Sequence, residues 1–280
     1  MERELALHQI TAMEASPAEL VRIAAATGCT RVCVFTHVPG NAAAFPLITR
    51  ETLPDMLAAM AETGVGVANI EFFPIAPDVP AETYREGFAL GQALGARLAV
   101  VHIHHPDDAG AVARLREVAD LAAEHGLQLG LEFMGLTPAC ASVQRAVWFV
   151  EAAARPNIGI AVDALHLART GGTPDDLRAI PAHLFAYAQI CDGHGLHRSS
   201  DYLREALDRQ LPGDGDFPLQ AMIEAMPPTV ALDVEVPSPT RAKQGIPALD
   251  RVREAVTRTR AIIARAAPRV RPAFLPDGPG

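Results

Sequence analysis

The 280-residue sequence has little positive charge and almost no lysine. Lys243 is its only lysine, and Lys and Arg together number 24 against 33 Asp and Glu, which gives a formal net charge of −9. No Lys- or Arg-rich run is present. Because the phosphate backbone of a nucleic acid is bound by clustered positive charge, this composition argues against a nucleic-acid partner.

Cysteine is also scarce, and no two of the four cysteines have CxxC spacing; they are Cys29, Cys33, Cys140 and Cys191. We interpret them as reduced, buried cysteines of a cytoplasmic protein. The N-terminus lacks a basic segment followed by a long apolar one, and no run approaches the roughly 20 apolar residues that a membrane span needs. We therefore expect neither a secretion signal nor a contact with the membrane.

Short apolar runs alternate with amphipathic segments along the whole chain. Strands are predicted at residues 5–11, 31–36, 65–72, 97–103, 127–133, 158–163, 185–191 and 230–236. Helices are predicted between and after them, at residues 17–27, 51–63, 81–94, 109–125, 142–154, 174–180, 202–208, 217–225 and 248–266. Several of these helices end at a glycine, the residue that best adopts the left-handed conformation that ends a helix.

Eight strand–helix units in succession predict a (β/α)8 (TIM) barrel as a single domain, over residues 1–267. A Pro-rich C-terminal tail over residues 268–280 would follow it. The competing architecture is an open, doubly wound sheet that binds a dinucleotide. That fold is disfavoured because no GxGxxG motif follows the first predicted strand.

Four consecutive predicted strands carry a polar side chain near their C-terminal ends: Glu132, Asp163, Gln189 and Glu235. Catalytic groups of a (β/α)8 barrel lie at these strand ends, so the four side chains should converge. Converging carboxylates repel one another, and a bound cation would offset this repulsion. An all-oxygen ligand set suits Mg²⁺ or Mn²⁺, with Zn²⁺ and Co²⁺ as alternatives. The simpler interpretation is that each acid caps a helix or pairs with an arginine.

The segments GLEFMG, VDALH, AQICDG and LDVEVPSP, in this order, resemble the xylose isomerase-like barrels of the sugar phosphate isomerase/epimerase superfamily. The resemblance implies that Glu132, Asp163, Gln189 and Glu235 bind one divalent metal ion. It also implies that Glu132 and Glu235 form the catalytic acid/base pair. His166, three residues after Asp163, would contact the substrate or the metal.

Two positions depart from the pattern of this superfamily. Gln189 replaces its usual histidine, and Pro138 stands about where its sugar epimerases place a second substrate-binding glutamate. The chemistry that the resemblance implies is isomerisation or epimerisation of a sugar, sugar acid or cyclitol, by proton transfer next to a carbonyl through an enediolate. The alternatives are a metal-dependent dehydratase of a keto-cyclitol or related polyol and a non-catalytic sugar-binding barrel. The partner in each case is a small polyol or keto-sugar, and a homodimer is an open alternative to a monomer.

Further candidates flank these four positions. His102 and His104, in the segment HIHHP, are predicted to bind the substrate, with a structural role or a second metal as alternatives. Arg198 is predicted to bind an anionic group of the substrate, and the alternative is a solvated loop. His8 and Glu71 should point toward the same mouth of the barrel, although each taken alone has a structural interpretation.

Overall fold

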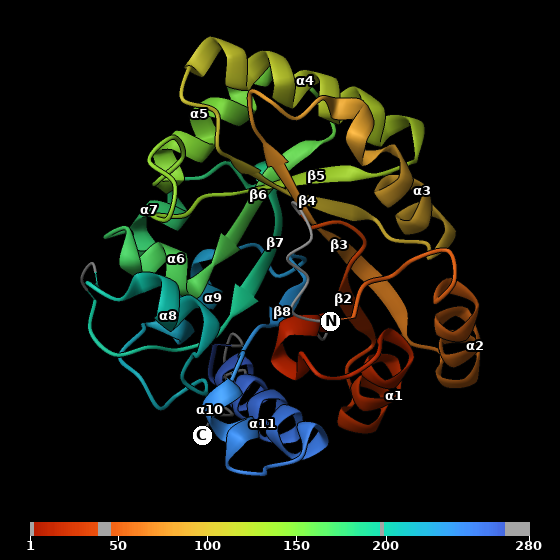
Figure 1. Ribbon diagram of the computed structural model, residues 1–280. Coiled ribbons are helices and arrows are strands. Elements are labelled where there is room, and N and C mark those ends of the chain that lie inside the picture. The colour runs from red at the N-terminus through yellow and green to blue at the C-terminus, as the bar shows by residue number, and fades with distance from the viewer. Residues whose placement is uncertain (1–2, 39–45, 197–198, 267–280) are drawn as a thin grey trace, which may run out of the picture.

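The computed structural model describes residues 3–38, 46–196 and 199–266, and its centre is a closed barrel of eight parallel strands (Figure 1). The strands follow one another around the barrel in chain order, and the eighth pairs with the first. They are β1 Leu5–His8, β2 Arg31–Phe35, β3 Gly66–Ile75, β4 Leu98–Ile103, β5 Gln128–Glu132, β6 Ile158–Asp163, β7 Phe185–Ile190 and β8 Leu232–Val234. The predicted (β/α)8 barrel is confirmed, whereas the tail proposed at residues 268–280 lies outside the described residues.

Helices surround the barrel on its outer side (Figure 1). They are α1 Pro17–Thr27, α2 Leu53–Thr63, α3 Arg85–Ala93, α4 Asp108–Glu124, α5 Val143–Ala153, α6 Ala164–Arg169, α7 Pro174–Arg178, α8 Tyr202–Leu207, α9 Leu219–Ala225, α10 Pro239–Lys243 and α11 Ala248–Ala266. Short 3-10 helices occur at η1 Gln9–Ala12, η2 Ala81–Tyr84 and η3 Ala182–Leu184. The sequence did not predict α6 and α10. Among the helices of the described residues, none combines the length and the apolar character needed to cross a membrane.

Local sequence accounts for where α1 begins and ends. Ser16 accepts a hydrogen bond from the backbone N–H of Glu19, and the Glu19 carboxylate accepts one from the backbone N–H of Ser16. Pro17 follows at the first position of the helix, where its missing N–H costs nothing. Gly28 ends the helix with φ 78°, a conformation that a side chain would strain. The four cysteines are free and buried, as expected.

The strand register sets the heights of the polar residues at the barrel mouth. His102 of β4 lies opposite Glu132 of β5, and Asp163 of β6 lies opposite Gln189 of β7. Gln189 in turn lies opposite Asp233 of β8. Parallel pairing therefore aligns these polar side chains, although they come from distant parts of the sequence.

Thr11 of η1 ties the chain on both sides of Glu235. Its Oγ1 donates to the carbonyl of Val234 at 2.8 Å and accepts from the backbone N–H of Val236 at 2.9 Å, and all of these atoms are buried. Thr11→Val keeps the shape but removes both buried hydrogen bonds, so we expect a loss of about 1–3 kcal/mol in the free energy of unfolding, measured in urea. Thr257→Val on the exposed side of α11 is the matched control, because among the described residues its Oγ1 bonds only the carbonyl of Arg253 within the helix. Equal losses in the two variants would contradict a role for Thr11 in stabilising the segment around Glu235.

Candidate active site

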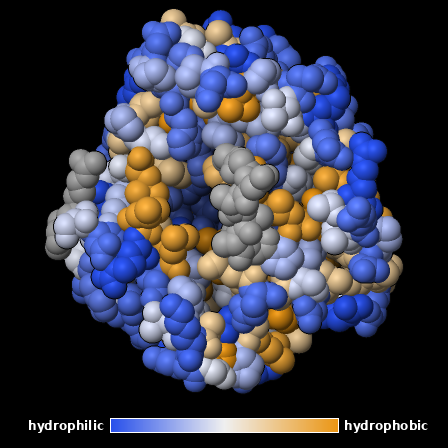
Figure 2. All heavy atoms as spheres, viewed as in Figure 1, coloured by the Kyte–Doolittle hydropathy of each residue, from blue (hydrophilic) through white to orange (hydrophobic). Residues whose placement is uncertain are grey.

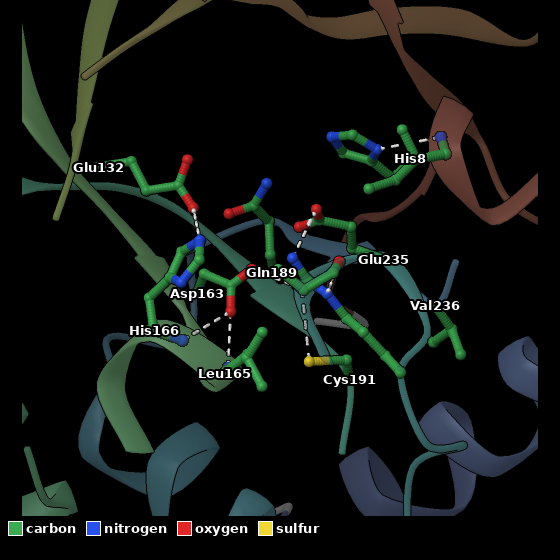
Figure 3. A network of polar contacts seen from close by, with 12 residues as sticks. His8, Glu132, Asp163, Leu165, His166, Gln189, Cys191, Glu235 and Val236 are labelled. Carbon is green, nitrogen blue, oxygen red and sulfur yellow. Dashed lines mark hydrogen bonds and ion pairs between the residues drawn. The ribbon is translucent and has the colours of Figure 1, made fainter. Parts of the chain in front are cut away.

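The structure brings the four predicted strand-end residues together at the mouth of the barrel (Figure 3). Glu132 and Asp163 end β5 and β6, Gln189 lies near the end of β7, and Glu235 follows β8 directly. All four are buried, with at most 5% of each residue exposed. A hollow with a hydrophilic floor opens at the centre of the face shown in Figure 2.

Asp163 is fixed by helix α6, which begins immediately after it. Its Oδ1 accepts hydrogen bonds from the backbone N–H groups of Leu165 at 2.6 Å and His166 at 3.0 Å. These are the N–H groups that a helix start leaves without partners, so the carboxylate acts as the N-cap. The same helix turn carries His166 into the site, where its Nδ1 lies 2.6 Å from the hydroxyl of Tyr202.

Glu132 lies between two histidines. Its Oε2 is 2.7 Å from Nε2 of His102, and its Oε1 is 3.4 Å from Nε2 of His166. The ring of His102 is itself stacked on Phe72, with 5.2 Å between the ring centres. Burial lowers the pKa of His166 below its ordinary value, which favours the neutral imidazole. Glu132 is thus held on both sides by groups that could also bind a substrate hydroxyl.

The other two predicted substrate-binding residues are not part of this cluster. His104 is exposed and lines an adjacent cavity at the mouth together with Leu136 and Pro138. The ring of His104 lies 6.2 Å from that of His102, centre to centre. Arg198 lies outside the described residues.

Arg209 contacts two of the site's acids, and the sequence analysis did not identify it. Its NH1 lies 2.6 Å from Oδ2 of Asp163, and its NH2 lies 3.0 Å from Oε1 of Glu235. Only 7% of the residue is exposed. One guanidinium therefore joins two of the four carboxylate and amide side chains predicted to bind a metal.

Backbone pairing explains how a residue in a long loop reaches this position. The backbone N–H of Arg209 donates to the carbonyl of Pro237, after β8, and Gln210 exchanges two hydrogen bonds with Asp192, after β7. The Arg209 side chain also donates from Nε to the carbonyl of Ala206. The only local signal is an arginine just before the turn sequence LPGDG, and it does not distinguish Arg209 from the exposed Arg204 five residues earlier.

The environment of the site shifts the pKa values of the two buried acids that Arg209 contacts in opposite directions. Burial would raise the pKa of Asp163, but Arg209, His166 and two backbone N–H groups outweigh it and hold that pKa below its usual range. For Glu235, burial is the largest effect, and the nearby charges of Asp163 and Glu132 add to it. The pKa of Glu235 therefore lies well above its ordinary value, although Arg209 acts to lower it.

The donor set fits a divalent cation. Oε1 of Gln189 and Oε2 of Glu235 are buried and have no hydrogen-bond partner among the described residues. Three buried carboxyl groups, those of Glu132, Asp163 and Glu235, converge here, and a bound cation would stabilise their ionised forms. Each carboxylate oxygen can accept more than one partner, so Arg209 and a cation can share Asp163. A ligand atom from each of Glu132, Asp163 and His166 also lies within 4.8 Å of the others.

A second group with suitable atoms, His8, Cys33 and Asp233, lies deeper in the barrel, and its ligand atoms are also within 4.8 Å of one another. Nδ1 of His8 accepts a hydrogen bond from the backbone N–H of Ile10 at 3.3 Å, so the ring hydrogen is on Nε2. That nitrogen lies 3.1 Å from Oε1 of Glu71. Sγ of Cys33 accepts a hydrogen bond from Nδ2 of Asn69 at 2.9 Å, whereas both carboxylate oxygens of Asp233 are buried and have no hydrogen-bond partner among the described residues.

Residues 21–261 match the family model described as the xylose isomerase-like TIM barrel. A comparison with curated proteins gives no match.

Solved structures with the same fold cover nearly the whole chain. A xylose isomerase domain protein from Alicyclobacillus acidocaldarius is 24% identical, with a TM-score of 0.71 and coverage of 94% of this chain and 99% of the other. An IolI protein with a bound zinc atom is 18% identical, with a TM-score of 0.71 and coverage of 94% and 97%. A D-allulose 3-epimerase from Methylomonas sp. in complex with D-allulose is 14% identical, with a TM-score of 0.70 and coverage of 95% and 98%.

Proposed function

Because the chain belongs to the xylose isomerase-like TIM barrel family, we propose that it is a metal-dependent isomerase or epimerase of a sugar, sugar acid or cyclitol. The observation that carries this proposal is the pair of buried carboxylates, Glu132 and Glu235, with the amide of Gln189 between them in Figure 3. The D-allulose 3-epimerase of similar fold, which was crystallised with its sugar, supports a sugar as the substrate class.

Glu132, Asp163, Gln189 and Glu235 would hold one divalent metal ion. Their oxygen atoms favour Mn²⁺ or Mg²⁺, with Zn²⁺ and Co²⁺ as alternatives, and zinc is the metal in the IolI protein of similar fold. A divalent cation bound there supplies a Lewis acid that acidifies a C–H bond next to a chelated carbonyl.

The protein's own residues then account for the proton transfer. One of the two glutamates, Glu132 or Glu235, removes the proton from carbon, and the substrate becomes an enediolate. If the other glutamate returns a proton to the opposite face, the product is an epimer. His102 and His166, which contact Glu132, would bind hydroxyl groups of the substrate. His104 would contact a part of the substrate that extends into the adjacent cavity.

Arg209 adds a function that the sequence analysis did not include. Its guanidinium contacts Oε1 of Glu235, so it favours the ionised form of that carboxylate, which is the form that accepts a proton. It also provides fixed positive charge where negative charge develops on the substrate oxygens. We therefore add Arg209 to the residues of the active site.

Metal binding is the first test of this proposal. The purified chain is expected to contain about one divalent metal ion, by elemental analysis, and Gln189→Ala is expected to weaken Mn²⁺ binding about 10-fold or more because it removes a ligand. Gln128→Ala, an exposed position at the other end of β5, should leave binding unchanged. Failure of the wild-type chain to bind either Mn²⁺ or Mg²⁺ would contradict the site assignment.

One assay identifies the reaction that follows proton removal. Keto-sugars and inososes are incubated with the Mn²⁺-loaded chain in deuterated water, and the products are analysed by NMR and by ultraviolet absorbance. Deuterium incorporation without new absorbance indicates an epimerase or isomerase. Loss of water from the same intermediate gives an unsaturated product that absorbs in the ultraviolet, which indicates the dehydratase. Binding without exchange of any proton would leave only a sugar-binding protein.

A further inference from the structure

Glu71 of β3 is a buried carboxylate inside the barrel that collects hydrogen-bond donors from three strands. Its Oε1 lies 3.1 Å from the Tyr187 hydroxyl, 3.1 Å from Nε2 of His8 and 3.3 Å from Nδ2 of Asn69. The fourth donor is Nε2 of Gln189, at 3.5 Å. Only 5% of Glu71 is exposed. The first three contacts hold Glu71 in place independently of Gln189.

The contact with Glu71 determines which way the Gln189 amide faces. An ionised carboxylate only accepts hydrogen bonds, so it favours the amide nitrogen on its side; the reverse orientation would place two oxygens against each other. With the nitrogen facing Glu71, Oε1 of Gln189 faces away from it. That oxygen is buried and has no hydrogen-bond partner in the part of the chain that the structure describes. At 3.5 Å the hydrogen bond to Glu71 is long and contributes little energy of its own. Its effect is on which atom of the amide faces the cation site.

We propose that Glu71 is a positioning residue that makes Gln189 a metal ligand, by holding the amide nitrogen and directing Oε1 toward the cation site. This inference rests on the proposed function, because it assumes a cation at the site formed with Glu132, Asp163 and Glu235. A glutamine amide presents either its oxygen or its nitrogen, depending on its partner, and only the oxygen binds a metal. A hydrogen-bond acceptor behind the amide therefore favours the orientation in which a glutamine binds a metal. Such supporting groups typically contribute about 10–100-fold to metal affinity.

A double-mutant cycle tests the proposal. Mn²⁺ dissociation constants are measured from the EPR signal of free Mn²⁺ for the wild type, Glu71→Met, Gln189→Ala and the double variant. In the wild-type background, Glu71→Met is expected to weaken Mn²⁺ binding about 10-fold or more. In the Gln189→Ala background the same change should matter less than about 2-fold, because the amide that Glu71 orients is gone. Glu86→Met, at an exposed position on α3, is the matched control and should leave binding unchanged.

Each other outcome has a distinct meaning. An equal loss in both backgrounds would show that Glu71 acts through its negative charge, which overturns the positioning role. Lack of Mn²⁺ binding by the wild-type chain would instead overturn the proposed function. If Glu71→Met does not fold, as judged by circular dichroism, the cycle is run with Glu71→Gln. That variant removes the charge but keeps an acceptor oxygen, so the proposal predicts a smaller loss, and a full loss that persists in the Gln189→Ala background contradicts it.

Discussion

Glu235→Gln is expected to lower turnover by about 10²–10⁴-fold and to abolish deuterium exchange into the substrate, while the barrel stays folded. Oε1 of Glu235 is held by Arg209, whereas its buried Oε2 has no hydrogen-bond partner among the described residues. A glutamine has nearly the same shape, but it can neither accept the proton from carbon nor return one. The variant also loses the charge of a residue proposed to bind the metal, so Mn²⁺ binding is measured in parallel and turnover is compared at saturating Mn²⁺.

Glu224→Gln is the matched control for this experiment. Glu224 lies on the exposed side of α9, and its carboxylate accepts a hydrogen bond only from Gln220 among the contacts described. We expect turnover and deuterium exchange equal to those of the wild type. If Glu235→Gln exchanged deuterium at the wild-type rate with metal bound, Glu235 would have no part in the proton transfer.

The sequence was sufficient for the barrel because each unit is specified locally. Short apolar runs, helix caps such as Ser16, and glycines such as Gly28 each mark one element, and eight units in succession leave few architectures. The errors lie where local signals are short or misleading. β3 continues beyond the predicted end at residue 72 to Ile75, through a proline that favours the end of a strand. Helix α6 is only six residues long, and its cap is Asp163, for which the sequence analysis gave helix capping as the alternative to metal binding.

The candidate site was predictable to the extent that strand order determines it. Glu132, Asp163, Gln189 and Glu235 could be brought together from the sequence because adjacent parallel strands place their ends at one edge. Arg209 could not be found in this way. Its position depends on the pairing of Gln210 with Asp192 and of its own N–H with Pro237, which are contacts between loops that no periodicity encodes. The link from Glu71 across the barrel to Gln189 likewise depends on side-chain length and rotamer.

Arg209→Met is expected to destabilise the metal-free chain by about 3–5 kcal/mol, because it leaves Asp163 and Glu235 buried without their shared cation. The measurement is chemical unfolding in the presence of EDTA. Arg204→Met on α8 is the control, since its ion pair with Asp201 is solvent-exposed and such pairs contribute about 0–1 kcal/mol. Similar losses in the two variants would show that the buried ion pairs of Arg209 contribute no more to stability than the exposed pair of Arg204 does.

Bound metal should offset much of the loss caused by Arg209→Met. Without the guanidinium, the bound cation is the only positive charge that pairs with the carboxylates of Asp163 and Glu235. The variant should therefore gain more stability from Mn²⁺ than the wild type does. A metal ion that binds only the folded state adds about 2.7 kcal/mol to the free energy of unfolding when its free concentration is 100 times its dissociation constant. Unfolding curves of both proteins with and without Mn²⁺ measure this difference directly. An equal gain in the two proteins would contradict this coupling, because it would mean that Arg209 and the metal stabilise Asp163 and Glu235 independently of each other.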